Sequence, residues 1–149
     1  MNTKTDRSIV QFCYIAQPYL HESGAVMDAR AKSGNLAAAY LVSKGVHCHS
    51  PIGASHAVNI LARDRFGAEQ THDYWLTQDI SMIMQCCNMM AILKLPGWEK
   101  SKGLREEMDL CERAHIPFAW VEWPGLYDTM HKETLADLDK IARMWWGSL

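Results

Sequence analysis

No apolar run in this sequence is long enough to cross a bilayer, which argues against a membrane-spanning helix. A surplus of positive charge is also missing. The formal net charge is -2, whereas a protein that binds a nucleic-acid polymer needs many Lys and Arg side chains to neutralise phosphates. The polar start, residues 1–7, lacks the pattern of a secretory signal. We therefore expect a cytoplasmic protein that binds neither a membrane nor a nucleic-acid polymer.

Paired-cysteine motifs are missing too. The sequence has five cysteines, an odd number, and no two of them form a Cys-x-x-Cys pair. This pattern indicates reduced thiols rather than a disulfide framework. Three histidines, His47, His49 and His56, lie close together in the sequence and could hold a metal. No further ligand has a diagnostic spacing, and local hydrogen bonding is the simpler explanation, so we predict neither a metal nor a cofactor.

What the sequence does contain is an alternation of strand-like and helix-like segments, over a length of 149 residues that suits one domain. Strands are expected at 8–16, 46–50, 89–95 and 118–122, and helices at 25–44, 73–86, 101–114 and 134–146, with a short helix near 57–63 in the ambiguous segment 51–67. Strands that alternate with helices indicate a mostly parallel sheet. We predict a single α/β domain over residues 1–149, a flavodoxin-like or Rossmann-like three-layer sandwich with four or five strands.

Glu107 interrupts the apolar face of the helix expected at 101–114. It lies three residues after Leu104 and four before Cys111, on the flank of the stripe that should pack on the sheet. A carboxylate at that place loses hydration, so it must be paired, hydrogen-bonded or protonated. A structural ion pair would satisfy this requirement, and so would a catalytic acid, base or nucleophile.

Asp79 is a second misplaced carboxylate. In the helix expected at 73–86 it lies inside the apolar arc, flanked by Trp75 and Ile80. A buried carboxylate that caps a neighbouring loop would explain it without any function. Two such carboxylates near one sheet edge favour a catalytic role more than one does, because enzymes that cleave a glycosidic bond usually use a pair of carboxylates.

The turn between the third strand and its helix has features of a ligand-binding loop. Gly97 and Gly103 allow close backbone approach to a ligand, and the helix start offers free N–H groups. Ser101 either caps the helix or binds an anion such as phosphate. Trp98, in the same turn, and Trp75 have rings that could stack on a nucleobase. Ligands bind beyond the carboxyl ends of parallel strands, so the loops after residues 16, 50 and 95, with His56 beyond the second, are candidate site segments.

Several segments, in this order, resemble motifs of the nucleoside 2-deoxyribosyltransferase superfamily. Residues 14–19 (Tyr-Ile-Ala-Gln-Pro-Tyr) resemble its opening motif, and residues 78–80 (Gln-Asp-Ile) resemble its central Asp helix. Residues 95–107 resemble its strand–turn–helix with the nucleophilic glutamate, and residues 116–118 the start of its next strand. The likeness extends to a small, mostly bacterial and phage branch, which residues 50–52 (Ser-Pro-Ile) and 55–56 (Ser-His) also match.

The resemblance implies a role for each matching position. Glu107 matches the glutamate that attacks the anomeric carbon and forms a covalent glycosyl-enzyme. Asp79 matches the aspartate that contacts the base or sugar and assists proton transfer, and Tyr14 matches the tyrosine that orients the nucleophile. Ser101 matches a serine that binds the 5′-phosphate in the 2′-deoxynucleoside 5′-phosphate N-hydrolases. The resemblance also implies a homo-oligomer, a dimer or larger, in which a neighbouring subunit helps to complete the site.

Some positions depart from the superfamily pattern. Gln17, which with Pro18 is a substrate-binding candidate, stands where relatives carry Gly or Ser, and Leu20 stands where some phosphate-binding members carry Arg. Two functions therefore stay open. The first is cleavage or transfer of the N-glycosidic bond of a nucleoside or nucleoside 5′-monophosphate, by an N-hydrolase or deoxyribosyltransferase. The second is a non-catalytic nucleotide-binding or sensing module on the same fold, because a fold does not guarantee an activity.

Overall fold

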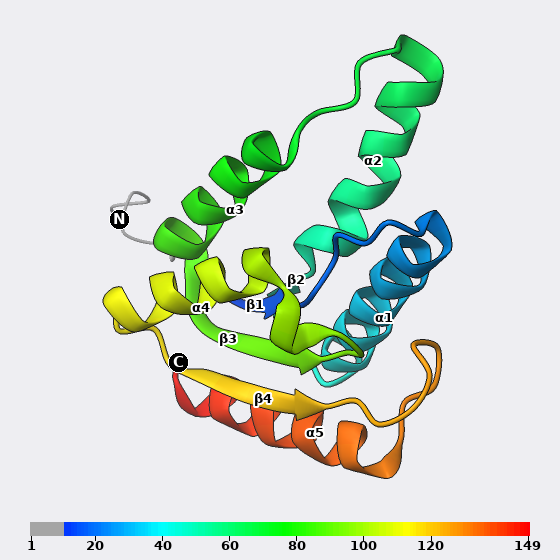
Figure 1. Ribbon diagram of the computed structural model, residues 1–149. Helices are drawn as coiled ribbons and strands as arrows, with labels where there is room; N and C mark the ends of the chain where they lie inside the picture. The colour runs from blue at the N-terminus through cyan, green and yellow to red at the C-terminus, as the bar shows by residue number, and fades with distance from the viewer. Residues whose placement is uncertain (1–10) are drawn as a thin grey trace.

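The computed structural model describes residues 11–149 (Figure 1). The polar start at 1–7 and the first residues of the strand expected at 8–16 lie outside the described residues. Four strands form one parallel sheet in the order β2-β1-β3-β4. They are β1 (Phe12–Ala16), β2 (Cys48–His49), β3 (Cys87–Lys94) and β4 (Phe118–Glu122). The connecting helices are α1 (Gly24–Ser43), α2 (Pro51–Phe66), α3 (His72–Cys86), the short 3-10 helix η1 (Trp98–Lys100), α4 (Lys102–Arg113) and α5 (Lys132–Gly147).

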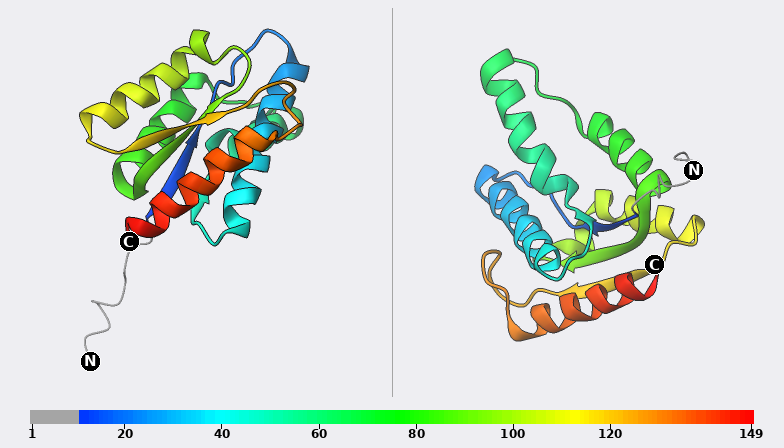
Figure 2. Two further views of the ribbon diagram at one scale, coloured as in Figure 1. Left: turned by 90° about the horizontal axis from the view of Figure 1, so that it is seen from below. Right: turned by 180° about the vertical axis from the view of Figure 1, so that it is seen from behind.

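Helices cover both faces of the sheet, as Figure 2 shows from two sides. Side chains alternate between the faces of a strand, so Cys13 and Ile15 of β1 join the core formed with α1 and α5. Tyr14 and Ala16 belong to the opposite core, which is formed with α3 and α4. The predicted α/β three-layer sandwich of the flavodoxin-like or Rossmann-like type is confirmed, with a four-stranded sheet.

The strand β3 lies in the middle of this arrangement, between β1 and β4. Its residues Met89 to Leu93 are all buried, which fits the continuous apolar run that predicted a strand covered on both faces. The parallel register pairs Ala16 with Ile92 and Lys94 with Glu122. The carboxyl ends of β1, β3 and β4 therefore lie along one edge of the sheet.

The segment 51–67 forms a much longer helix than the short one expected near 57–63. Ser50 caps α2 by accepting a hydrogen bond from the Gly53 backbone N–H, and Pro51 occupies its first turn. Gly67, with φ 63, ends it in the left-handed conformation that glycine favours. Only Pro51 is buried in this helix, so its sequence lacks the apolar stripe from which a helix is usually predicted.

The helices α2 and α3 diverge from the sheet and are joined by residues 67–71 at their far ends (Figure 1). The first turns of α2 lie near β1, and α2 packs mainly against α1. The helix α3 leads directly into β3, because its last residue, Cys86, precedes the first strand residue, Cys87. The helix α3 therefore ends at the edge of the sheet opposite the one at which α2 begins.

Candidate active site

A cavity of about 330 Å³ lies at the carboxyl end of β1, on the sheet face that α3 and α4 cover. Its size lies in the range of small-molecule sites. The loop after β1, the helices α2 and α3, and the start of α4 supply its walls. The polar side chains that line it are those of Gln17, Tyr19, Ser55, Asn59, Gln70, His72, Asp79, Lys100, Ser101, Lys102 and Glu107.

Glu107 lies on the buried side of α4, as its spacing predicts. Ser101 caps this helix by accepting a hydrogen bond from the Leu104 backbone N–H at 3.3 Å. The buried residues of the helix are Leu104, Glu107 and Cys111. The Tyr14 hydroxyl, on the central strand β1, donates a hydrogen bond to Glu107 Oε2. The carboxyl is therefore held between the middle of the sheet and the cavity.

Asp79 is the second buried carboxyl of the cavity. It shares the inner side of α3 with Ile83, and both are buried. Ile80, expected in the same apolar arc, is 40% exposed. The prediction that Ile80 belongs to the buried face is wrong. The side of α3 that carries Asp79 and Ile83 packs against the protein, and Ile80 lies next to that side, at the surface.

Burial governs the protonation of both carboxyls. It raises the pKa of Glu107 to about 8, and the neighbouring Asp79 adds to that rise, whereas the hydrogen bond from Tyr14 opposes it. Burial also raises the pKa of Asp79 to about 6, again opposed by Tyr14. At pH 7 the pair therefore holds one proton. Two carboxyls with such separated pKa values are suited to act as an acid and a base or nucleophile.

Four other predicted binding residues, Gln17, Trp75, Ser101 and Gly103, line the same cavity. The Gln17 side-chain amide donates a hydrogen bond to the Arg30 carbonyl at 2.6 Å and is thereby fixed in place. The Trp75 indole N–H is buried without a hydrogen-bond partner among the described residues. An unpartnered buried donor is costly.

Four predicted binding residues lie outside the cavity lining. Pro18 is buried next to Gln17. His56 lies behind Tyr19, to whose hydroxyl it is hydrogen-bonded at 2.5 Å. Trp98 packs against Trp120, with ring centroids 5.2 Å apart. Its role in stacking on a nucleobase stays a prediction. The fourth is Gly97, in the loop after β3.

Arg30 explains the position of Gly97. This buried side chain donates hydrogen bonds to the carbonyl of Leu20 at 3.0 Å and to that of Pro96 at 2.9 Å. It therefore ties the loop after β1 to the loop after β3. Gly97 has φ 88, and a Cβ there would lie 2.7 Å from Arg30 Nη2. Glycine is needed here for the backbone conformation and for the close approach of Arg30.

Sequence reasoning missed several lining residues. Tyr19 was part of a recognised motif without an assigned role, and Lys100 and Lys102 flank Ser101 at the start of α4. The α2 residues Ser55 and Asn59 face the cavity, but their helix lacks the apolar pattern that would have revealed which side packs inward. In the sequence, the spacing of Ser55 and Asn59 by four residues indicates that both side chains lie on one side of a helix.

Three structural observations concern other classes of site. Among residues 11–149, no three His, Cys, Asp or Glu side chains come close enough together to hold a metal ion. The described helices include none with the length and apolarity needed to cross a membrane. All five cysteines carry free thiols.

Residues 11–122 match the protein family described as Domain of unknown function (DUF1937). The match spans most of the chain, and the chain belongs to this family. No curated protein matches the chain. The family description names no activity, so the geometry and chemistry of the cavity supply the grounds for a function.

Replacing Glu107 by Gln is expected to stabilise the protein increasingly as the pH rises from about 5 to 8. The ordinary pKa of this carboxyl is 4.5, and burial raises it to about 8. The unfolded chain therefore loses its proton before the folded one does, and the stability that protonated Glu107 contributes is lost as the pH rises toward 8. Gln does not titrate, so the variant escapes a loss on the order of 1.4 kcal/mol per pH unit.

Urea unfolding of the wild type and Glu107→Gln at pH 5, 6, 7, 8 and 9 measures this difference, which should level off above pH 8. The matched control is Glu112→Gln, which neutralises an exposed carboxylate on the same helix. A difference that stays constant with pH, or that Glu112→Gln reproduces, would contradict the raised pKa of Glu107.

Proposed function

We propose that this member of a family of unknown function cleaves or transfers the N-glycosidic bond of a nucleoside or nucleoside 5′-monophosphate, with Glu107 as the nucleophile. The observation that carries the proposal is the Tyr14–Glu107 hydrogen bond at a cavity that Asp79 also lines. Enzymes that transfer a glycosyl group through a covalent intermediate use two carboxyl groups, one as the nucleophile and one as the acid that protonates the leaving group. The resemblance to the nucleoside 2-deoxyribosyltransferase superfamily supports the same assignment.

In the proposed first step, a Glu107 carboxylate oxygen bonds to the anomeric carbon of the sugar while the bond to the nucleobase breaks. For this step the proton that the pair shares passes from Glu107 to Asp79, and Asp79 gives it to the departing base nitrogen. The Tyr14 hydroxyl holds the other carboxyl oxygen and fixes the direction of attack. In the second step, water or a second base displaces Glu107 from the sugar, and the carboxylate returns.

The rest of the cavity supports a nucleotide as ligand. Trp75 offers an aromatic ring at the cavity wall, and a nucleobase has a face that stacks on such a ring. Lys100, Lys102 and Ser101 lie around the N-terminus of α4. We propose that these groups bind the 5′-phosphate, because cations and free helix N–H groups both favour an anion.

One observation favours a second candidate function. Because burial raises the pKa of Glu107 to about 8, the carboxyl in the empty cavity is protonated at neutral pH. A protonated carboxyl donates a hydrogen bond and does not attack. A nucleotide-binding or sensing module would use Glu107 as this donor, and it would bind nucleotides without releasing a base.

The surface of α2 supports the proposal of a homo-oligomer. This helix has exposed apolar side chains at Val58, Leu61 and Phe66, and Phe66 is 83% exposed. Exposed apolar residues grouped on one element are typical of an interface. The free thiols of the chain support a reducing compartment, and we propose a cytoplasmic location.

Incubation with a panel of nucleosides and nucleoside 5′-monophosphates should release free base, detected by chromatography. Glu107→Ala is expected to fold and to lose turnover by at least about a thousandfold, because it removes the group that forms the intermediate. Glu112→Ala, on the exposed side of α4, is the control. Unchanged turnover in Glu107→Ala would refute the nucleophile, and nucleotide binding without base release by the wild type would favour the sensing module.

The pH dependence of kcat/KM on the substrate found in that panel should be bell-shaped, with limbs near pH 6 and pH 8. Activity requires one proton on the carboxyl pair, and burial raises the pKa of Asp79 to about 6 and that of Glu107 to about 8. Activity should therefore rise with pH through 6 and fall through 8. In Asp79→Asn the falling limb should disappear, because the proton donor is gone, and a single rising limb from the ionisation of Glu107 should remain. A wild-type profile flat from pH 5 to 9 would contradict the shared proton.

The oligomer proposal predicts that Phe66→Asp lowers the mass of the particle in solution. A charge at this exposed apolar position opposes burial in an interface and leaves the monomer core untouched. Size-exclusion chromatography with light scattering at several protein concentrations measures the mass, with Leu126→Asp, at another exposed apolar residue, as control. A monomeric wild type at all concentrations would contradict the proposal.

A further inference from the structure

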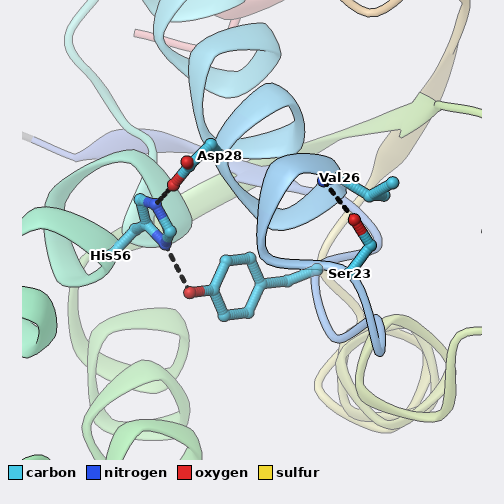
Figure 3. Close-up of polar contacts among 5 residues, drawn as sticks. Ser23, Val26, Asp28 and His56 are labelled. Carbon is cyan, nitrogen blue, oxygen red and sulfur yellow. Dashed lines mark hydrogen bonds and ion pairs between the residues drawn. The ribbon is translucent and has the colours of Figure 1, made fainter.

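Three side chains beside the cavity are joined in a row by hydrogen bonds, and they have no role in the mechanism proposed so far. His56 Nε2 lies 2.5 Å from Asp28 Oδ1, and His56 Nδ1 lies 2.5 Å from the Tyr19 hydroxyl (Figure 3). The three residues come from the loop after β1, from α1 and from α2. Tyr19 lines the cavity, whereas His56 and Asp28 do not. The chain therefore runs from the protein surface to the cavity wall.

The donors and acceptors of this chain follow from its chemistry. An ionised Asp28 can only accept, so the imidazole proton lies on Nε2 and points to Asp28. The other ring nitrogen, Nδ1, is then an acceptor, and the Tyr19 hydroxyl donates its proton to it. The lone pairs of the Tyr19 oxygen that remain can accept a proton from a molecule in the cavity.

Solvent exposure of the side chains falls from Asp28 to His56. The side chain of Asp28 is 58% exposed and that of His56 is 13% exposed, so a proton that reaches His56 can pass to solvent. Burial, with a further contribution from Asp28, raises the pKa of Tyr19. Tyr19 therefore does not rest as a phenolate, and it can take up a proton only as it gives its own to His56.

We propose that Tyr19, His56 and Asp28 form a proton relay that deprotonates the acceptor water in the second step of the reaction. The relay rests on the proposed function. The water oxygen bonds to the anomeric carbon, and the ester bond to Glu107 breaks with its electron pair returning to the carboxylate. The water proton moves to the Tyr19 oxygen, and the Tyr19 proton moves to His56 Nδ1. The carboxylate of Asp28 stabilises the imidazolium that forms, which then releases a proton to solvent.

The relay gives the two steps separate proton-transfer groups. Asp79, on α3, protonates the leaving base in the first step. The relay reaches the cavity from other elements, because Tyr19 belongs to the loop after β1 and His56 to the first turns of α2. Removing the relay should therefore slow the second step and leave the first step intact.

Rapid-quench measurement of base release tests this separation, with the substrate identified by the panel. Tyr19→Phe keeps the ring beside the His56 imidazole, 5.5 Å between centroids, and removes only the hydroxyl. We expect it to release one equivalent of base per subunit at the wild-type rate and then to turn over on the order of 100-fold more slowly. Tyr40→Phe, which removes a hydroxyl bonded to Asp139 far from the cavity, is the control.

His56→Ala should show the same burst and the same slow phase. Added imidazoles of increasing basicity should restore the slow phase in proportion to their basicity, because they replace the base of the relay. Rescue that is independent of basicity would indicate packing. Slowing of the burst itself, or unchanged steady-state turnover in both variants, would overturn the relay while leaving the nucleophile assignment standing. Absence of base release by the wild type would instead refute the proposed function, and the relay with it.

Discussion

The hydrogen bond from Tyr14 to Glu107 is the interaction on which the rest of the site depends. It joins the central strand β1 to the helix α4, and both side chains are buried. A buried carboxyl loses its hydration. The hydrogen bond from the Tyr14 hydroxyl replaces part of that hydration and fixes the orientation of the Glu107 side chain. The same burial keeps a proton on the Glu107–Asp79 pair at neutral pH. The geometry of the cavity and its acid–base chemistry therefore have one common origin.

Arg30 supplies the frame around this contact. Its guanidinium binds the backbone carbonyls of the loops that follow β1 and β3, and it does so as a buried cation without a carboxylate partner among the described residues. Carbonyl oxygens at 2.9 and 3.0 Å replace the water that the guanidinium has lost. The loop that carries Tyr19 is thereby fixed relative to the loop that leads into α4. Tyr19 and Ser101 can face one cavity because Arg30 sets the distance between their loops.

The sequence was sufficient for the sheet, for most helices and for both carboxyls. An apolar run such as Met89 to Leu93 has one physical meaning, and a charged residue at a core position of a helix, such as Glu107, contradicts its surroundings in a visible way. The length of α2 could not be predicted, because a helix that buries only Pro51 leaves no periodic trace. The position of Trp98 could not be predicted either, since it depends on the aromatic neighbour Trp120 from a later strand. The link between His56 and Asp28 is likewise a tertiary contact between two helices.

The small buried area of α2 has a consequence for ligand binding. A helix held by so few buried side chains belongs to the least stable part of a domain and opens more readily than the central strands. Ser55 and Asn59 nevertheless form part of the cavity wall from this helix. A ligand that touches them binds the form in which α2 is folded and not the locally opened form. Affinity and the local unfolding equilibrium of α2 are therefore thermodynamically linked, and a residue that strengthens α2 far from the cavity would tighten binding without touching the ligand.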